Sequence, residues 1–278
     1  MRNVEVRTIK KRYTVRPKTD AQEKVLSFID ARPVVDVDEP KLVELPLVEK
    51  HGFVSVAFPG GHICEGTSMQ LLSDLHVFHY NETRREFPDA TLIHCASIKT
   101  AQGHILIVGD KAAGKTTLML RLAIAGLDVV GDEHFILAND LSIPRPRTLR
   151  VKEGSLKLLP DEHAALIRRC PSVGDWYGAR IFSIAPDRFG RPWELSSAPV
   201  TQIIILRSNH GGRSKIRRKT GDYLLENLLE NALLPETGRL AGFVRLRQMC
   251  QSCNAWELSL GDLDEAENLI YRLSVNDL

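Results

Sequence analysis

The stretch HILIVGDKAAGKTTLMLRLAIAG, residues 104–126, decides the fold. Residues 104–108 form a short, mostly apolar run that predicts a β-strand, and residues 115–125 are good helix formers. Between them, residues 109–116 match the pattern G-x-x-x-x-G-K-[ST] at every fixed position. The alternative is a glycine-containing strand-to-helix turn without a ligand. The complete motif with both flanks favours a phosphate-binding P-loop.

The chemistry of a P-loop explains why these residue types occur at this spacing. Small residues let successive backbone N–H groups turn toward a phosphate, and the start of a helix adds partial positive charge there. Lys115 would reach the β- and γ-phosphates of ATP, and the hydroxyl of Thr116 would bind Mg²⁺. The predicted nucleotide-binding residues are Gly109, Asp110, Lys111, Ala112, Ala113, Gly114, Lys115, Thr116 and Thr117.

An acid pair, Asp132 and Glu133, follows the next short apolar run at residues 127–130. A phosphoryl-transfer site needs a carboxylate, either to hold Mg²⁺ or to accept a proton from the attacking group. We expect residues 127–130 and 135–138 to be separate strands, with the acids at the end of a strand parallel to the P-loop strand. The predicted metal ligands are therefore Thr116, Asp132 and Glu133. An acidic turn between two strands is the alternative.

The remaining pattern predicts an α/β fold with two parts. Residues 90–278 alternate between apolar strands and helices, and they form the expected P-loop core. Residues 1–89 are expected to be a small, partly irregular α+β extension with short strands and a helix, because prolines interrupt them repeatedly.

The bulk composition excludes several classes of protein. A formal net charge of +2 gives no indication of binding to nucleic acid or to acidic membranes. No apolar run approaches the roughly 20 residues needed to cross a bilayer, and the basic N-terminus lacks an apolar signal segment. We therefore expect a cytoplasmic protein. The five cysteines lack a disulfide-like spacing and are expected to be reduced.

Residues 93–137, from IHCASIKT through the P-loop to GDEHFIL, resemble the core of the HPr kinase/phosphorylase family and its shorter bacterial relatives. The resemblance covers roughly residues 90–275 and implies a kinase core related to phosphoenolpyruvate carboxykinase. It implies that the P-loop binds ATP with Mg²⁺, that Asp132 is the catalytic base, and that a homo-oligomer is plausible. His94, on the strand before the P-loop strand, would orient Asp132. A lone histidine on an apolar strand is otherwise a satisfied core residue.

The sequence also departs from the family pattern. Glu133 stands where the family usually has a second Asp, which changes the reach of that carboxylate. The E-x-R-G-L-G-like signature linked to dephosphorylation is absent, so phosphorylase activity is not expected. Some short relatives phosphorylate a serine of a precursor peptide. We expect a serine kinase in which Asp132, Lys115 and His94 are catalytic. A small-metabolite kinase and a nucleotide-binding regulator are the alternatives.

Weaker signals concern the acceptor and other sites. Residues 207–219 carry six basic residues and no acid, which would suit an acidic peptide or protein substrate but also a solvated hairpin. Arg145 and Arg147 could stabilise the transferred phosphoryl group, or they could be solvated turn residues. A single C-x-x-C, at Cys250 and Cys253, gives little support for a zinc site.

Overall fold

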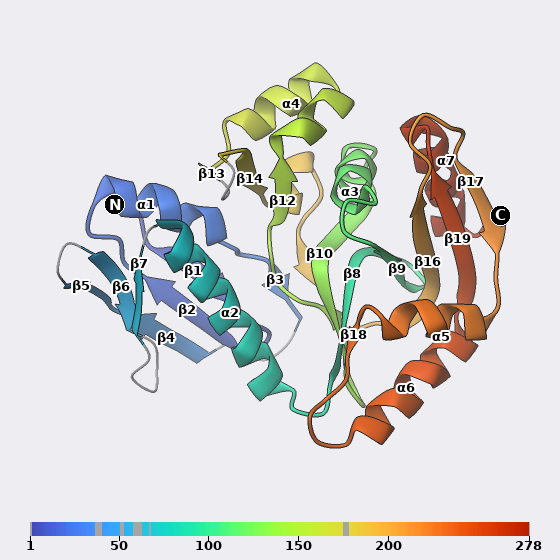
Figure 1. Cartoon of the computed structure of the whole chain (residues 1–278), viewed down its shortest axis with the longest axis horizontal. Coiled ribbons are helices and arrows are strands. Elements are labelled where there is room, and N and C mark those ends of the chain that lie inside the picture. Colours follow the sequence, from blue (N-terminus) through green and yellow to red (C-terminus); the bar gives the residue numbers. More distant parts are fainter. Residues whose placement is uncertain are drawn as a thin grey trace. The chain divides into compact units, whose positions relative to one another are not determined.

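The computed structural model describes residues 2–36, 41–50, 53–57, 63–66, 68–174 and 178–277 (Figure 1). Its packing forms two compact units, each made of two segments of the chain. Unit 1 consists of Met1–Glu86 and Pro146–Ala185, and unit 2 of Phe87–Arg145 and Pro186–Leu278. Within the described residues, every helix is too short or too polar to cross a membrane.

Unit 2 is built on an eight-stranded sheet with the order β11-β10-β8-β9-β16-β19-β17, in which β18 also pairs with β8. β16 pairs in parallel with both β9 and β19, whereas β8 is antiparallel to both β9 and β10. Apart from a short β15, the strands are β8 (Thr91–Thr100), β9 (Gly103–Gly109), β10 (Asp128–Leu137), β11 (Ser142–Pro144), β16 (Val200–Ser208), β17 (Lys215–Arg218), β18 (Ala232–Leu233) and β19 (Asn254–Leu260). The mixed α/β class agrees with the sequence pattern.

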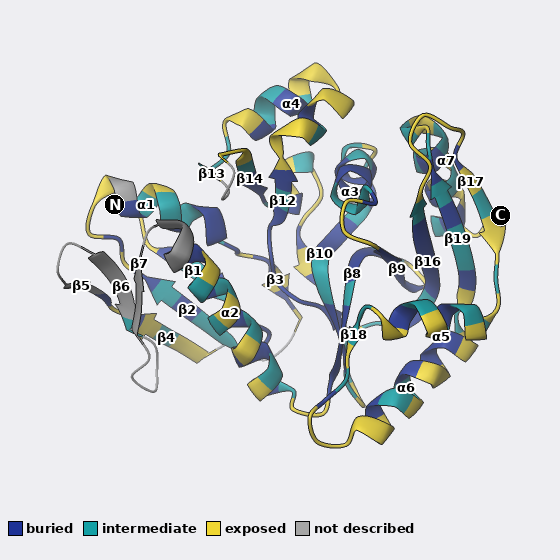
Figure 2. Ribbon diagram, in the orientation of Figure 1, coloured by how far each residue is buried: buried dark blue, intermediate teal, exposed yellow. Residues whose placement is uncertain are grey.

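Helices cover both faces of this sheet. One face packs its alternate apolar residues against leucines of α5 (Gly221–Leu229) and α6 (Arg239–Ser252). The opposite face is covered by α3 (Lys115–Ile124) and α7 (Leu263–Ser274), which also contact each other. Every residue of β9 is buried, as Figure 2 shows, because helices lie on both sides of it. A short 3-10 helix, η3 (Pro186–Phe189), and β15 (Glu194–Leu195) precede β16.

The arrangement around β10 corrects the expectation for the acid pair. Residues 128–137 form one strand, with an irregularity between Val129 and Gly131, so Asp132 and Glu133 lie inside a strand and not in a turn. The reason is that β10 pairs with β8 through the acids, with Asp132 opposite Ala96 and Glu133 opposite Cys95. In turn, β8 turns back on β9 through a tight connection at Gly103, which has a φ of 140°. The antiparallel β8 therefore lies between β9 and β10, instead of β10 pairing directly with β9.

Unit 1 contains three small sheets. The strands β1, β2 and β4 form one sheet, β5, β6 and β7 a second, and β12, β14 and β13 a third. Their bounds are β1 (Val4–Arg7), β2 (Lys11–Val15), β4 (Lys41–Leu45), β5 (Leu47–Lys50), β6 (Phe53–Ala57), β7 (Ile63–Gly66), β12 (Leu149–Lys152), β13 (Ser172–Gly174) and β14 (Arg180–Ile184); β3 is Val34–Val35. The helices are α1 (Asp20–Leu26), η1 (Ser27–Ile29), α2 (Ser68–Glu86), η2 (Glu153–Leu158) and α4 (Asp161–Arg168).

Residues 146–185 pack with the N-terminal residues, although the sequence pattern assigned them to the core beginning at residue 90. Val173 and Ile181 lie against the apolar cluster formed by β1, β2, α1 and α2. Arg150 also stacks over the ring of Phe28, with 5.3 Å between the guanidinium carbon and the ring centroid. These contacts give the segment an apolar partner within unit 1.

Candidate nucleotide-binding site

The connection between β9 and α3 lies where the sequence predicts a phosphate-binding loop. It needs left-handed backbone at two positions, Ala112 (φ 69°) and Gly114 (φ 98°). A Cβ at Gly114 would come within 2.7 Å of Leu260 Cδ2, and a Cβ at Gly109 within 2.8 Å of the Leu206 carbonyl oxygen. Gly109 is therefore required by close packing against backbone, and Gly114 by its left-handed conformation. The loop leads directly into the first turn of α3, whose N–H groups have no acceptor within the helix.

Lys115 turns its ammonium group back over this loop. Its Nζ donates to the carbonyl oxygens of Gly109 and Asp110, the latter at 3.2 Å. Burial lowers the pKa of Lys115, while the carboxylate of Asp132 acts in the opposite direction. The ammonium group therefore lies beside backbone carbonyl oxygens at the start of the loop. An anion bound there would add a stronger acceptor.

Thr116 and Asp132 meet across the strands. The Thr116 hydroxyl, in the first turn of α3, donates to Asp132 Oδ2 at 2.7 Å. Asp132 comes from β10, where it lies opposite Ala96 of β8. A hydroxyl and a carboxylate are hard oxygen donors, the kind that Mg²⁺ binds. These two residues fit the magnesium position that the sequence predicts for them.

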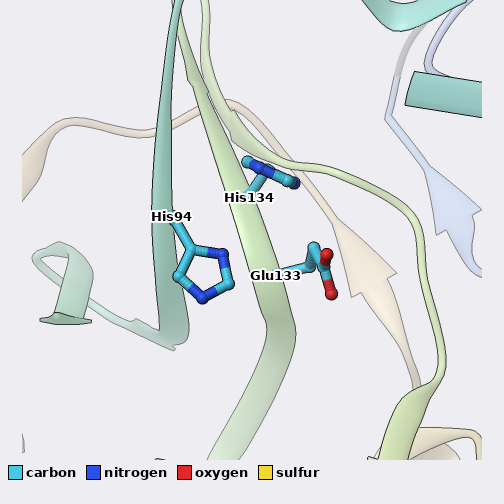
Figure 3. Close-up of side chains that lie close together, drawn as sticks. All are labelled: His94, Glu133 and His134. Carbon is cyan, nitrogen blue, oxygen red and sulfur yellow. The ribbon is translucent and has the colours of Figure 1, made fainter. Parts of the chain in front are cut away.

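The third predicted metal ligand, Glu133, belongs to a second group with His94 and His134 (Figure 3). Each of the three side chains offers a ligand atom, and these atoms all lie within 4.8 Å of one another. His94 and His134 are direct cross-strand partners on β8 and β10, with ring centroids 5.5 Å apart. Burial, together with the charges of Arg145 and His94, lowers the pKa of His134 to about 3, so this imidazole is neutral at pH 7.

His94 lies opposite His134, and Asp132 lies opposite Ala96. The predicted orienting contact between His94 and Asp132 stays a prediction. Sequence reasoning did not select His134. Its signal is its position two residues after Asp132 on a strand, but its pairing with His94 depends on strand register, which the sequence does not specify.

The other predicted residues divide between the two units. Asp110, at the loop, lies 3.8 Å from Arg207 at the end of β16, and solvent reaches both side chains. Lys111 and Ala112 are exposed, whereas Ala113 and Thr117 are buried. Arg145 is buried in unit 2, where its backbone N–H donates to the His134 carbonyl oxygen at 2.9 Å.

Arg147 belongs to unit 1. There it lines a small cavity together with His76, His79 and Thr148, on a wall that also contains apolar residues of β1 and η1. The two arginines that the sequence pattern grouped together are therefore in different units. Of this pair, only Arg145 belongs to the unit that contains the loop.

Comparison with known proteins gives little independent information. No family model matches this chain, and no curated protein matches it. Among solved structures, the Hpr(Ser) kinase/phosphatase from Coxiella burnetii is similar with a TM-score of 0.30 and 14% sequence identity. That match covers 66% of this chain and 98% of the other. A similarity of this size carries no argument about function, so function must be inferred from the residues of the site.

Proposed function

We propose that this chain is an ATP- and magnesium-dependent kinase that transfers the γ-phosphoryl group to a hydroxyl, and that the acceptor is a serine of a protein or peptide. The observation that carries the proposal is the 2.7 Å hydrogen bond from Thr116 to Asp132. It joins the first turn of the helix after the glycine loop to a carboxylate on another strand. The pair brings a hydroxyl and a carboxylate together beside the glycine loop, as magnesium coordination next to bound phosphates requires.

The residues of the chain have distinct tasks in this proposal. The loop backbone and the start of α3 bind phosphate oxygens. Lys115 donates to oxygens of the β- and γ-phosphates, on which negative charge develops in the transition state. Thr116 and Asp132 would hold Mg²⁺, which neutralises phosphate charge when bound. Asp132 also accepts the proton of the acceptor hydroxyl. The oxygen of the acceptor hydroxyl then forms a bond to the γ-phosphorus, while the bond between this phosphorus and the oxygen of the leaving ADP breaks.

A basic edge strand supports a peptide acceptor over a small metabolite. β17 is the last strand in the order of the sheet, and Lys215, Arg217 and Arg218 on it are exposed. The Lys219 N–H bonds inward to the Ala255 carbonyl oxygen at 2.9 Å. Backbone groups alternate along an antiparallel strand, so those of Ile216 and Arg218 face outward. An extended acidic peptide would find both charge and backbone partners on this edge.

The register across the sheet places this edge in line with the loop. Lys215 lies opposite Ser259, Ser259 lies opposite Arg207, and the residue before Arg207 lies opposite Gly109. Three strand spacings, about 14 Å, separate β17 from β9, so about four extended residues cross the strand ends from the loop before the peptide turns to run along β17. We therefore expect acidic residues about four positions from the phosphorylated serine.

The test is ATP binding and turnover of Lys115→Ala, with Lys157→Ala as the matched control. Lys157 is an exposed lysine on η2 of unit 1. Lys115→Ala should weaken ATP binding in isothermal titration and abolish ATP-dependent phosphorylation, because it removes the charge aimed at the phosphates. Lys157→Ala should change neither quantity. Unchanged ATP affinity in Lys115→Ala would refute the proposal. Binding without turnover in the wild-type chain, toward peptides and metabolites alike, would favour the nucleotide-binding regulator.

A further inference from the structure

His94, Glu133 and His134 form a group that the proposed kinase reaction does not fully use. The two imidazoles face each other across a pair of hydrogen-bonded strands, and the carboxylate comes from the residue next to one of them. Figure 3 shows the three side chains gathered beside β8 and β10. All three residues are partly exposed.

The chemistry of these ligands selects a class of ion. Imidazole nitrogen suits zinc, cobalt, nickel, copper and iron, whereas magnesium prefers oxygen ligands and water. Two histidines with one carboxylate are the protein ligands of a divalent ion that keeps at least one open position. We propose that His94, Glu133 and His134 bind a divalent transition-metal ion, at a position separate from the Thr116–Asp132 pair.

The distances and the backbone are compatible with this site. Tetrahedral ligands at metal-bonding distance lie about 3.4 Å from each other, and the three ligand atoms present here lie within 4.8 Å of one another. The two strands fix the positions of both histidines, because β8 and β10 pair from Asp128 to Leu137. A site on paired strands needs little backbone movement to close on an ion.

One charge opposes the ion. Arg145 is buried near His134 and contributes to the electrostatic environment of its ring. Glu133 supplies the negative charge that offsets this guanidinium. The carboxylate is therefore as important to the site as the imidazoles, and its removal should weaken binding even though both nitrogen ligands remain.

The experiment is titration of the tag-free, chelator-treated whole chain with Co²⁺, without nucleotide, followed by visible absorption and by isothermal titration. We expect one equivalent to bind, without the thiolate-to-cobalt absorption that the cysteines would give. Millimolar Mg²⁺ should not displace it. His94→Ala and His134→Ala should each weaken Co²⁺ binding more than about 100-fold. Loss of a group that only hydrogen-bonds to a metal ligand already costs about 10–100-fold, and the loss of a ligand itself should cost more. Glu133→Gln should weaken binding while it preserves the size of the side chain.

Two control variants distinguish this site from a nonspecific surface histidine and from the Thr116–Asp132 pair. His210→Ala removes an exposed histidine from another loop and should leave Co²⁺ binding unchanged. Asp132→Asn should sharply reduce phosphorylation but retain Co²⁺ binding, so the failure of one proposal does not imply the failure of the other. Circular dichroism checks that each variant is folded, and His134→Gln replaces His134→Ala if the latter unfolds. The proposal is wrong if the wild-type chain binds no Co²⁺, or if folded His134 variants bind it as tightly as the wild type.

Discussion

At the scale of single residues, Asp132 has two tasks in the proposed reaction. It accepts a hydrogen bond from Thr116 at 2.7 Å, which suits a metal ligand, and it is also the candidate general base. These tasks differ in what their loss would do. A metal ligand contributes to binding of the nucleotide–magnesium complex, whereas a general base acts only in the transition state.

We predict that Asp132→Asn lowers turnover by about 10²–10⁴-fold while ATP affinity changes only a few-fold, because the amide cannot accept the acceptor's proton. Steady-state kinetics and isothermal titration on the same preparation measure both quantities. The matched control is Asp128→Asn, which makes the same chemical change at the start of the same strand and should alter neither quantity. Equal losses of affinity and turnover in Asp132→Asn would identify Asp132 as a metal or structural residue alone.

A second residue-scale prediction concerns Glu82 on α2 of unit 1. Its carboxylate is almost buried, accepts from Tyr13 Oη, and lies 2.7 Å from Lys11 Nζ and 2.6 Å from Arg85 Nη1. Burial acts to raise the pKa of Glu82, but the hydrogen bonds from Lys11, Tyr13 and Arg85 outweigh it and lower this pKa from 4.5 to about 2. The ionised form is therefore the one that stabilises the fold.

Glu82→Gln should destabilise the chain by about 2 kcal/mol at pH 7, because it removes the charge-assisted hydrogen bonds of a buried carboxylate while water still solvates Lys11 and Arg85. The folded pKa lies below the unfolded one, so the contribution is complete above pH 4.5 and is lost as the pH falls toward about 2. The difference in melting temperature between wild type and variant should shrink over that range. The exposed Glu226→Gln is the control. A difference that does not depend on pH would contradict the proposed role of the Glu82 charge.

At the scale of elements, β17 combines an unpaired outer edge, among the described residues, with three exposed basic side chains. Basic residues on an edge strand also prevent two copies from pairing with each other. These two roles make different predictions about an acidic partner. If the basic residues only keep two copies apart, reversing their charge should leave the KM for the acceptor unchanged. If they bind the peptide, the reversal should change the KM for the peptide but not the KM for ATP.

Reversing Arg217 and Arg218 to Glu should raise the KM for the peptide acceptor, leave the KM for ATP nearly unchanged, and flatten the salt dependence of peptide binding. The matched control reverses Arg168 and Arg169, two exposed arginines at the end of α4, and makes the same change in net charge. Activity insensitive to both salt and the reversal would leave β17 as a solvated edge and favour a small-metabolite acceptor.

The elements around the loop also show where sequence patterns are informative. The apolar run before Gly109 and the helix formers after Lys115 correspond to β9 and α3, because local propensity and burial agree there. The sequence pattern predicts two separate strands, residues 127–130 and 135–138, with the acid pair at the end of the first. The structure instead accommodates Gly131 within β10, where a Cβ would come within 3.0 Å of Pro144 Cβ and of Ser97 Oγ.

At the scale of the whole molecule, the pairing of distant segments could not be predicted from local pattern. Whether His94 lies opposite His134 depends on the register of β8 against β10. The irregularity after Val129 shifts this register. The assignment of residues 146–185 to unit 1 depends on Val173 and Ile181 finding apolar partners far away in sequence. Such contacts depend on tertiary packing, to which periodicity within one segment is insensitive.

The discontinuity of both units has a consequence for how the chain is made. The N-terminal residues emerge from the ribosome long before residues 146–185, which complete their packing. The loop strand β9 must likewise wait for β16, and β16 for β19, before either is enclosed. During synthesis both units are therefore incomplete at the same time, with apolar surface exposed on each. The nascent protein should depend on chaperones until nearly all of its length has been translated.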